Sequence, residues 1–325
     1  MRATAVANAN LALVKYWGKR DEGLILPQHG SISLTLEGLE TRTLVAFDPS
    51  LEEDDIRLGG RRVGSPRRVQ GLLHIVRAMA GTDCRARVES ENGFPTAAGL
   101  ASSASAFAAL ALAASRAAGL ELEGAALSRL ARQGSGSACR SVYGGFVEWL
   151  PGSLPDGSDS FSVPLAPQDH WDLPVLIVLV RSGAKEVPSS EGMRRSVETS
   201  PFYPVWRQQA EKDLNLLRQA IAERDLHLLG RVAEENAMRM HAVAMAASPP
   251  VLYWSPGTLR VLEKVRALRR EGLHAYASMD AGPHVHVLTS RDCAAALEAE
   301  LAALPEVSEV LVSGPGPAAR LLGAE

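Results

Sequence analysis

Short stretches of alternating hydrophobic and polar residues dominate the first half of the chain, and longer segments with helical spacing lie between them. Alternation with a period of two is typical of strands, whereas apolar residues repeating every three or four positions indicate helices. The predicted strands lie at residues 3–14, 30–36, 43–47, 85–91 and about 142–149. The predicted helices lie at about 67–80, 102–118 and 120–133.

The second half opens on Val175–Val180, a continuous apolar run of the kind that forms a strand buried on both faces. Helices are expected at 189–197, 204–223, 226–246, 256–271 and 291–303, and strands at 274–279, 284–288 and 307–312. This order of elements suggests a ferredoxin-like sandwich with extra helices. Because 151–159 is rich in Pro, Gly, Ser and Asp, we predict two domains, 1–172 and 173–325.

Composition narrows the function classes. The chain has 325 residues, 46% hydrophobic and 22% charged, with a net charge of −3, so a nucleic-acid partner is not expected. No apolar stretch reaches the roughly 18 residues of a membrane span, and we expect no signal peptide. The three cysteines are widely spaced, which indicates neither a disulfide framework nor a zinc site and favours the cytosol.

The stretch 93–118 is the strongest candidate for a phosphate site. Pro95–Leu100 leads into Ser102, Ser103 and Ser105, and an alanine-rich run follows. A serine-capped helix beginning at a tight glycine loop presents free amides and a positive dipole to an anion. Neither a Walker loop nor a strand-flanked GxGxxG is present. The same residues also fit a capped core helix without a ligand.

Two further segments concentrate phosphate-binding side chains. Residues 15–19, KYWGK, combine two lysines with a tyrosine in a short turn, although a solvated surface turn is an equally simple interpretation. Residues 134–141, GSGSACRS, offer amides, hydroxyls and one arginine, and a flexible linker is the alternative there. This second loop contains no acidic residue, so any catalytic base must come from elsewhere.

That acid is expected in Ser278–His286, where Asp280 follows a predicted strand and precedes a Gly-Pro turn. Such an aspartate is often a turn cap, but a strand end can also aim a carboxylate into a cleft. His284 and His286 alternate on the next strand and are interpreted as surface residues, because no third metal ligand is evident. His241, within a helix, is interpreted as a core or interhelix residue.

Five motifs in this order, KYWGK, PTAAGLASSAS, SGSACR, SSEGM and MDAGP, resemble the diphosphomevalonate decarboxylase branch of the GHMP kinase superfamily. Most kinases of the superfamily have glycine where this chain has Ala101. The resemblance implies an α+β fold with two domains: an N-terminal α/β domain like ribosomal protein S5 domain 2, and a C-terminal ferredoxin-like sandwich with extra helices. It also implies ATP and Mg²⁺ as cofactors, no separate protein-held metal, and a homodimer.

The resemblance also assigns roles to residues. Asp280 would orient or deprotonate the substrate 3-hydroxyl, Arg140 would grip its carboxylate or phosphate, and Lys15 would assist phosphoryl transfer. The implied substrate-binding residues are Tyr16, Trp17, Gly18, Lys19, Arg68, Ser135, Gly136, Ser137, Ala138, Cys139, Arg140, Ser189, Ser190 and Met193. The implied ATP-binding residues are Ser90, Asn92, Pro95, Gly99, Leu100, Ala101, Ser102, Ser103 and Ser105. Relatives often have arginine in place of Ser190, and Arg194 is the nearest substitute.

The implied reaction is ATP-dependent decarboxylation of mevalonate 5-diphosphate to isopentenyl diphosphate, with ADP, phosphate and CO₂ as the other products. Two alternatives stay open from the sequence. One is a close relative, either a mevalonate or phosphomevalonate 3-kinase or a decarboxylase of the 5-monophosphate. The other is a catalytically silent ligand-binding protein on the same fold.

Overall fold

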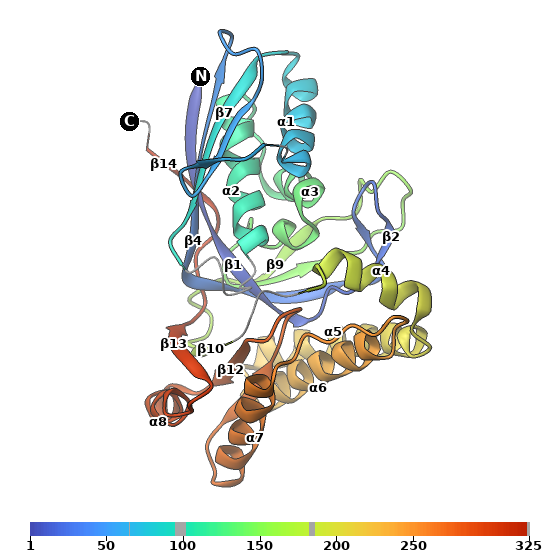
Figure 1. Ribbon diagram of the computed structural model, residues 1–325, viewed down its shortest axis with the longest axis vertical. Coiled ribbons are helices and arrows are strands. Elements are labelled where there is room, and N and C mark those ends of the chain that lie inside the picture. The colour runs from blue at the N-terminus through green and yellow to red at the C-terminus, as the bar shows by residue number, and fades with distance from the viewer. Residues whose placement is uncertain (65, 95–101, 182–185, 324–325) are drawn as a thin grey trace.

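The computed structural model describes residues 1–64, 66–94, 102–181 and 186–323, apart from the side chain of Ser102. Its larger sheet has eight strands, with β14, β1, β4, β7, β5 and β6 in that order and β8 and β9 branching from β4 (Figure 1). These strands are β1 (Arg2–Val14), β4 (Ser31–Asp48), β5 (Asp55–Leu58), β6 (Arg61–Arg62), β7 (Arg85–Asn92), β8 (Phe146–Trp149), β9 (Ser162–Ala166) and β14 (Arg320–Leu322). A separate hairpin pairs β2 (Lys19–Asp21) with β3 (Leu26–Pro27).

The two strands predicted at 30–36 and 43–47 are one continuous strand, β4, and the prediction of a break between them was wrong. Part of the segment between them, Glu40–Arg42, pairs with β1, and residues 36–39 lie at a register shift between Asn8 and Asn10 of β1. This irregularity absorbs the extra residues of β4, and Gly38 there has a φ of 78°, which favours glycine. A bulge therefore joins the two predicted strands into one.

Three helices cover one face of this sheet: α1 (Arg67–Ala80), α2 (Ser102–Ala117) and α3 (Gly124–Gly134) (Figure 1). Alanines of α2, which are small enough for close approach, join Ala5 and Ala7 of β1 in one buried cluster. Helix α3 begins four residues later than predicted. Gly119, with a φ of 79°, ends the preceding segment, and Glu123 is still extended.

The second sheet has four antiparallel strands in the order β11 (Ala275–Ser278), β12 (Val285–Thr289), β10 (Val175–Val180) and β13 (Val307–Ser313). The helices around it are α4 (Ser189–Thr199), α5 (Tyr203–Glu223), α6 (Leu226–Met245), α7 (Pro256–Arg270) and α8 (Arg291–Ala302). Every residue of β10 is buried, since Val175 and Ile177 face one hydrophobic cluster while Leu176 and Val178 face another. The continuous apolar run thus reflects burial on both faces.

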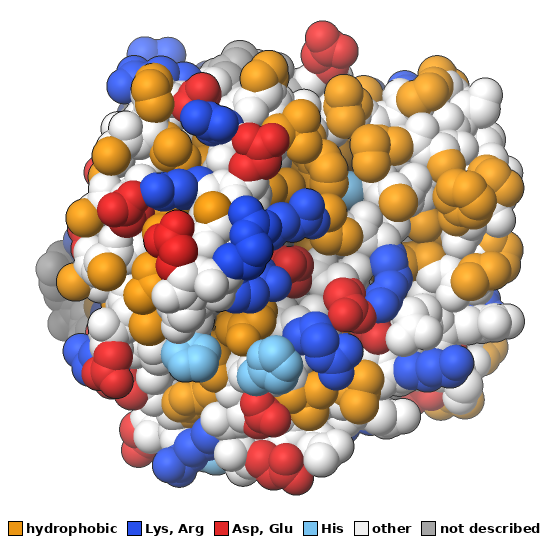
Figure 2. All heavy atoms as spheres, turned by 90° about the horizontal axis from the view of Figure 1, so that it is seen from below, with side chains coloured by type: hydrophobic (Ala, Val, Ile, Leu, Met, Phe, Trp, Pro, Cys, Tyr) orange, Lys and Arg blue, Asp and Glu red, His pale blue; other side chains and the backbone are white. Residues whose placement is uncertain are grey.

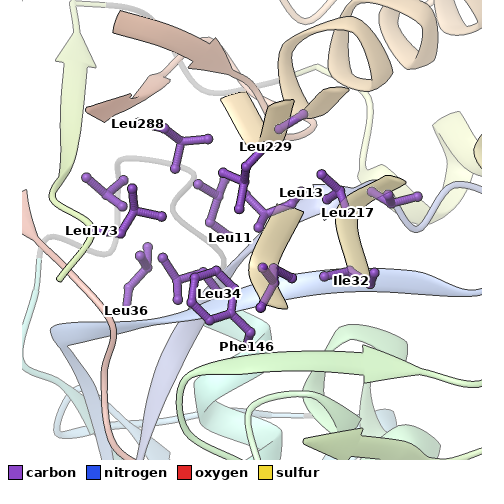
Figure 3. Packing of buried hydrophobic residues seen from close by; sticks show 14 of the residues in the cluster. Leu11, Leu13, Ile32, Leu34, Leu36, Phe146, Leu173, Leu217, Leu229 and Leu288 are labelled. Atoms are coloured by element: carbon purple, nitrogen blue, oxygen red, sulfur yellow. The ribbon is translucent and has the colours of Figure 1, made fainter. Parts of the chain in front are cut away.

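One hydrophobic cluster joins the two sheets. Leu11 and Leu34 of the larger sheet lie beside Leu217 of α5, Leu229 of α6 and Leu288 of β12 (Figure 3). The chain also returns to its first sheet near its end, where Thr4 of β1 pairs with Leu322 of β14. The α+β architecture is confirmed, whereas the domain division at 172 and 173 stays a prediction.

Seen from below the orientation of Figure 1, the surface mixes Lys and Arg with Asp, Glu and hydrophobic side chains (Figure 2). This intermixing on that face agrees with the nearly balanced charge of the chain. Within the described ranges, the structure contains no helix that combines the length and the apolar character needed to cross a membrane.

Candidate active site

A buried ion pair forms where the two sheets meet. Strand β1 ends at Val14, and Lys15 follows it; strand β11 ends at Ser278, two residues before Asp280. Lys15 Nζ donates to Asp280 Oδ1 at 2.6 Å and to the Ala12 carbonyl at 2.7 Å. The fold therefore joins residues 265 positions apart in the sequence. The Lys15 ammonium is thus held at two points.

The Asp280 carboxylate is both ionised and reachable. Burial raises the pKa of its carboxyl, but the charge of Lys15, with His286 and Arg140, outweighs this effect and places the pKa below its ordinary value. Although Asp280 is surrounded by protein atoms, 31% of its side chain remains exposed, against 2% for Lys15. Burial lowers the pKa of the Lys15 ammonium, which Asp280 opposes. A substrate can therefore meet the carboxylate but not the ammonium side of the pair directly.

Arg140 is held nearby by neutral oxygens. It follows a short 3₁₀ helix, Gly136–Cys139, and is 2% exposed. Its Nη1 donates to Ser31 Oγ at 2.6 Å, and its Nη2 donates to Asn10 Oδ1 at 3.1 Å. None of these partners is an anion, so the guanidinium keeps its charge for another acceptor. Its electrostatic influence reaches both Lys15 and Asp280.

Two histidines, His241 and His286, face this pair, and a third, His284, lies next to His286. The interpretation of His284 and His286 as surface residues was wrong, because they are only 8% and 6% exposed. His286 lies on β12 and His284 directly before it; the amide of Val180 donates to His284 Nδ1 at 3.1 Å. His241, on α6, is buried as expected. Burial lowers its pKa to about 3 and that of His286 to about 4.

We expect the His286→Asn protein to lose less stability than the unchanged protein when the pH falls from 7 to 5. The pKa of His286 drops from 6.5 to about 4 on folding, chiefly through burial. The unfolded chain therefore binds more protons below pH 6.5, and the stability present above that value is lost as the pH falls toward 4. At pH 5 this loss is about 2 kcal/mol. Urea unfolding at both pH values measures it.

The exposed His74 on α1 supplies the matched control for that measurement. His74→Asn should leave the loss of stability between the two pH values unchanged. Equal losses in the His286→Asn and His74→Asn proteins would contradict the assignment of the acid sensitivity to His286.

A polar corner around Tyr16 lies beside the ion pair. Among the described residues the buried Tyr16 hydroxyl has no hydrogen-bond partner, and burial raises the pKa of this phenol. Gly136 lies directly against it, since a Cβ there would come within 2.7 Å of the Tyr16 ring and hydroxyl. A buried phenol with a spare proton fits a phosphate oxygen. Arg68, whose pKa burial lowers and the neighbouring Tyr16 raises, donates from Nε to the Gly134 carbonyl at 2.8 Å.

The remaining substrate candidates fall into two groups. In the first group, Lys19 forms an ion pair with Glu22. Ser135 Oγ lies 3.5 Å from Ser137 Oγ. Ala138 and Cys139 are buried in the 3₁₀ turn. This turn replaces the flexible linker that was the alternative for the segment.

In the second group, Trp17 lies in an aromatic cluster and donates to Ser196 Oγ at 2.9 Å, and Met193 packs against the same cluster. Gly18, with a φ of 119°, leaves room for Tyr203, whose hydroxyl donates to the Trp17 carbonyl. Ser189 and Ser190 open helix α4. Arg194, the possible substitute for a missing arginine, is engaged by Glu191 and Glu198 on the surface.

The nucleotide candidates are only partly described. Pro95, Gly99, Leu100 and Ala101 lie outside the described residues, as does the Ser102 side chain. Helix α2 begins at Ser102 and has no acidic residue in its first turn, which favours an anion there. Ser103 Oγ lies 3.3 Å from Ser135 Oγ, so this helix start borders the 134–141 loop.

Polar contacts from β4 order the neighbouring nucleotide candidates on β7 and α2. Thr41 donates to Asn92 Oδ1 at 2.7 Å and contacts Ser105 Oγ at 2.6 Å, and Thr43 contacts Ser90 Oγ at 2.8 Å. The described residues contain no cluster of His, Cys, Asp or Glu that could hold a metal ion by itself.

Sequence reasoning missed the residues that hold the charged groups in place. Asn10 and Ser31 orient Arg140, while Asn236 accepts the backbone N–H of Lys15 at 2.9 Å. Asn10 lies between the buried apolar residues Ala9 and Leu11, whereas Asn236 follows two glutamates and joins the buried face of α6 only at helical spacing, with Ala233 and Met240. An asparagine inside an apolar segment was thus an available signal for Asn10 alone, because a buried amide needs partners.

Two family models match the chain. The model described as the diphosphomevalonate decarboxylase-like N-terminal domain matches residues 7–162, and that of the mevalonate 5-diphosphate decarboxylase C-terminal domain matches residues 175–311. Together they cover most of the chain.

Among curated proteins, the diphosphomevalonate decarboxylase of Bos taurus is 40% identical over 316 residues, covering 90% of this chain and 78% of that protein. Among solved structures, MDDEF in complex with MVAPP, AMPPCP and magnesium is 43% identical with a TM-score of 0.94, covering 100% of this chain and 99% of the other. Mevalonate diphosphate decarboxylase from Staphylococcus aureus is 40% identical with a TM-score of 0.94, covering 99% and 98%.

Proposed function

The chain belongs to the diphosphomevalonate decarboxylase family, and from this membership we propose its reaction and the part each residue takes in it. The protein catalyses the ATP-dependent decarboxylation of mevalonate 5-diphosphate to isopentenyl diphosphate, ADP, phosphate and CO₂. The observation that carries the proposed residue roles is the partly exposed Asp280 carboxylate, kept ionised by Lys15 beside Arg140.

Asp280 is the group that meets the substrate 3-hydroxyl. Hydroxide is a poor leaving group, so this oxygen is first phosphorylated by ATP, and loss of the phosphate then leaves positive charge on the carbon. An ionised carboxylate serves both stages: it accepts or orients the hydroxyl proton, and it stabilises the developing cation. Lys15 holds the carboxylate in place and keeps it ionised.

Arg140 binds the carboxylate that leaves as CO₂, or the transferred phosphate. Its side chain is anchored through Asn10 and Ser31, so little freedom is lost when an anion binds. The Ser/Gly turn before it packs directly against Tyr16, because Gly136 has no side chain to keep the ring away.

The substrate diphosphate is assigned to Tyr16, Lys19 and Arg68. The orphaned Tyr16 hydroxyl needs an acceptor, and both cations lie on elements next to it. Trp17, Gly18, Ser135–Cys139 and Ser189, Ser190 and Met193 form the remainder of the proposed substrate surface.

ATP is assigned to the start of helix α2, with Ser90, Asn92, Ser103 and Ser105 around it; the sequence candidates within 95–101 lie outside the described residues. Two features favour a triphosphate here: the first turn of α2 has no acidic side chain, and the hydroxyls of Ser103 and Ser135 lie beside it. Mg²⁺ would neutralise charge on the phosphates during transfer. ATP and Mg²⁺ are the cofactors of the family reaction.

We also propose that the protein is a cytoplasmic homodimer with domains at 1–172 and 173–325. Matches of the family models to 7–162 and 175–311 support that boundary. Cys84, Cys139 and Cys293 are free thiols, which supports a reducing compartment. Family members are commonly homodimers.

We expect the purified protein, given ATP and Mg²⁺, to release ADP, phosphate and CO₂ in equal amounts from mevalonate 5-diphosphate, and far less from mevalonate or its 5-phosphate. Equal yields follow because the transferred phosphate must leave before CO₂ does. The three products are quantified together for each substrate. ADP without phosphate or CO₂ would instead mean a 3-kinase, and turnover only of the monophosphate would keep the chemistry but change the substrate.

A further inference from the structure

The backbone of Lys15 is anchored separately from its side chain. Strand β1 pairs with β4 through Val14 and Ile32, and the amide of Lys15 is the next one along the chain. That amide donates to Asn236 Oδ1 on helix α6 at 2.9 Å. A buried backbone N–H that follows the end of a strand lowers the stability of the fold unless another group accepts its hydrogen bond. Helix α6 thus supplies the partner that the sheet does not.

Asn236 is itself fixed at both ends. It is 0% exposed, and its Nδ2 donates to Asp213 Oδ2 on helix α5 at 2.8 Å. The amide N–H of Lys15 can only donate and the Asp213 carboxylate can only accept. The side-chain amide of Asn236 therefore has one possible orientation.

Asp213 is buried and held by two more side chains. It is 2% exposed, and it accepts from Gln209 Nε2 at 2.8 Å and from Arg239 Nη1 at 3.2 Å. Arg239 reaches the surface, where it also pairs with Glu235. A continuous series of hydrogen bonds therefore runs from the surface of α5 and α6 to the backbone of Lys15.

We propose that Asp213 and Asn236 are positioning residues for the reaction: they fix the backbone of Lys15, so that its ammonium holds the Asp280 carboxylate where the substrate 3-hydroxyl arrives. The inference rests on the proposed function, which gives Asp280 its role. A displacement of about 1 Å at a reacting group can cost about 100-fold in rate. Neither Asp213 nor Asn236 touches the substrate in this arrangement.

A purely structural role would be different. A buried aspartate bound to an arginine also holds helices together, and its loss lowers stability wherever it lies. The test must therefore separate the rate and pH dependence of turnover from stability.

In the Asn236→Leu protein we expect kcat for CO₂ release to fall about 10- to 100-fold. The acid limb of the kcat–pH profile should move to higher pH, because burial raises the pKa of Asp280 once Lys15 holds it less firmly. The titratable or charged groups facing Asp280 are Lys15, Arg140, His241 and His286, and only Lys15 is bonded to Asn236. KM for ATP should stay within about twofold.

Asp54 gives a matched control. It is also a buried aspartate paired with an arginine, Arg77 at 2.9 Å, and it accepts the amide of Ala86, but it lies between α1 and β7 away from Lys15. Asp54→Asn should lower the melting temperature without changing kcat or moving the acid limb of the kcat–pH profile.

The Asp213 variants test the next bond in the series. Asp213→Asn keeps an oxygen for Asn236 and should retain kcat within about threefold, whereas Asp213→Leu should lower kcat as much as Asn236→Leu does.

Hydrogen exchange at the Lys15 amide provides a reading independent of turnover. Exchange should become faster in the Asn236→Leu protein and stay unchanged in the Asp54→Asn protein. If the unchanged protein releases no CO₂, the proposed function fails, and the exchange measurement alone decides on the anchoring of Lys15. If it is active, and folded Asn236→Leu protein keeps kcat within twofold with the same acid limb, the inference is overturned. Should Asn236→Leu not fold, Asn236→Ser is judged by the same readings.

Discussion

Replacing Asp280 with asparagine should reduce turnover of mevalonate 5-diphosphate by about 1,000-fold or more, while ATP binding stays close to intact. Asparagine has the size of aspartate but can neither take a proton nor stabilise positive charge as an anion. The nucleotide candidates Asn92 and Ser103 are held by Thr41 and Ser135, not by Asp280. Steady-state kcat and direct ATP titration measure the two expectations.

The Asp280→Asn protein should also lose stability, because Lys15 would be left as a buried charge without its anion, at about 3 kcal/mol. The double variant Lys15→Met with Asp280→Asn removes both charges and should recover most of that stability without recovering turnover. Recovery of stability and rate together would show that Asp280 acts only through folding. Activity of Asp280→Asn within tenfold would remove it from the chemistry.

Replacing Lys15 with methionine should lower kcat by about 100-fold and move the acid limb of its pH profile upward. The direction follows from the opposing effects on Asp280: burial raises its carboxyl pKa, and Lys15 is the foremost of the groups that lower it. Without Lys15 a higher pH is needed to keep the carboxylate ionised. The kcat–pH profile between pH 5 and pH 8 measures the shift.

Lys19 provides the comparison for that experiment, since it lies in the same motif but pairs with Glu22 instead of Asp280. Lys19→Met should raise KM for the diphosphate and leave the acid limb of kcat in place. An unmoved acid limb in the Lys15→Met protein would mean that another group keeps Asp280 ionised.

Most elements of the fold could be predicted because their patterns report burial directly. Val175–Val180 is apolar throughout and lies between two hydrophobic clusters, and α7 begins at the Ser255 cap with Pro256 in its first turn. The errors came from long-range pairing. Nothing local indicates that residues 37–42 continue a strand, since Glu40–Arg42 find their partners on β1 and residues 36–39 lie at a register shift.

The residues of the candidate site also fall into those that local sequence indicates and those that only the packing of distant elements brings together. Lys15, Arg140 and Asp280 could be proposed because they lie in recognisable motifs, although only the fold brings Lys15 to Asp280. His286 was misplaced, because its alternation with valines indicated a strand with one exposed face, whereas every residue of β12 is buried. Asp213 and Asn236 lie on two different helices, and their hydrogen bond depends on how those helices pack.

The pairing of β1 with β14 has a consequence for the order of events during synthesis. Leu322 is the partner of Thr4, so the outer edge of β1 at residues 4–6 stays unpaired until residue 322 has left the ribosome. Until then, a nascent chain carries this part of the strand with one edge open to other strands, which is a hazard for aggregation. Among the described strands, the one nearest the C-terminus thus covers the start of the first.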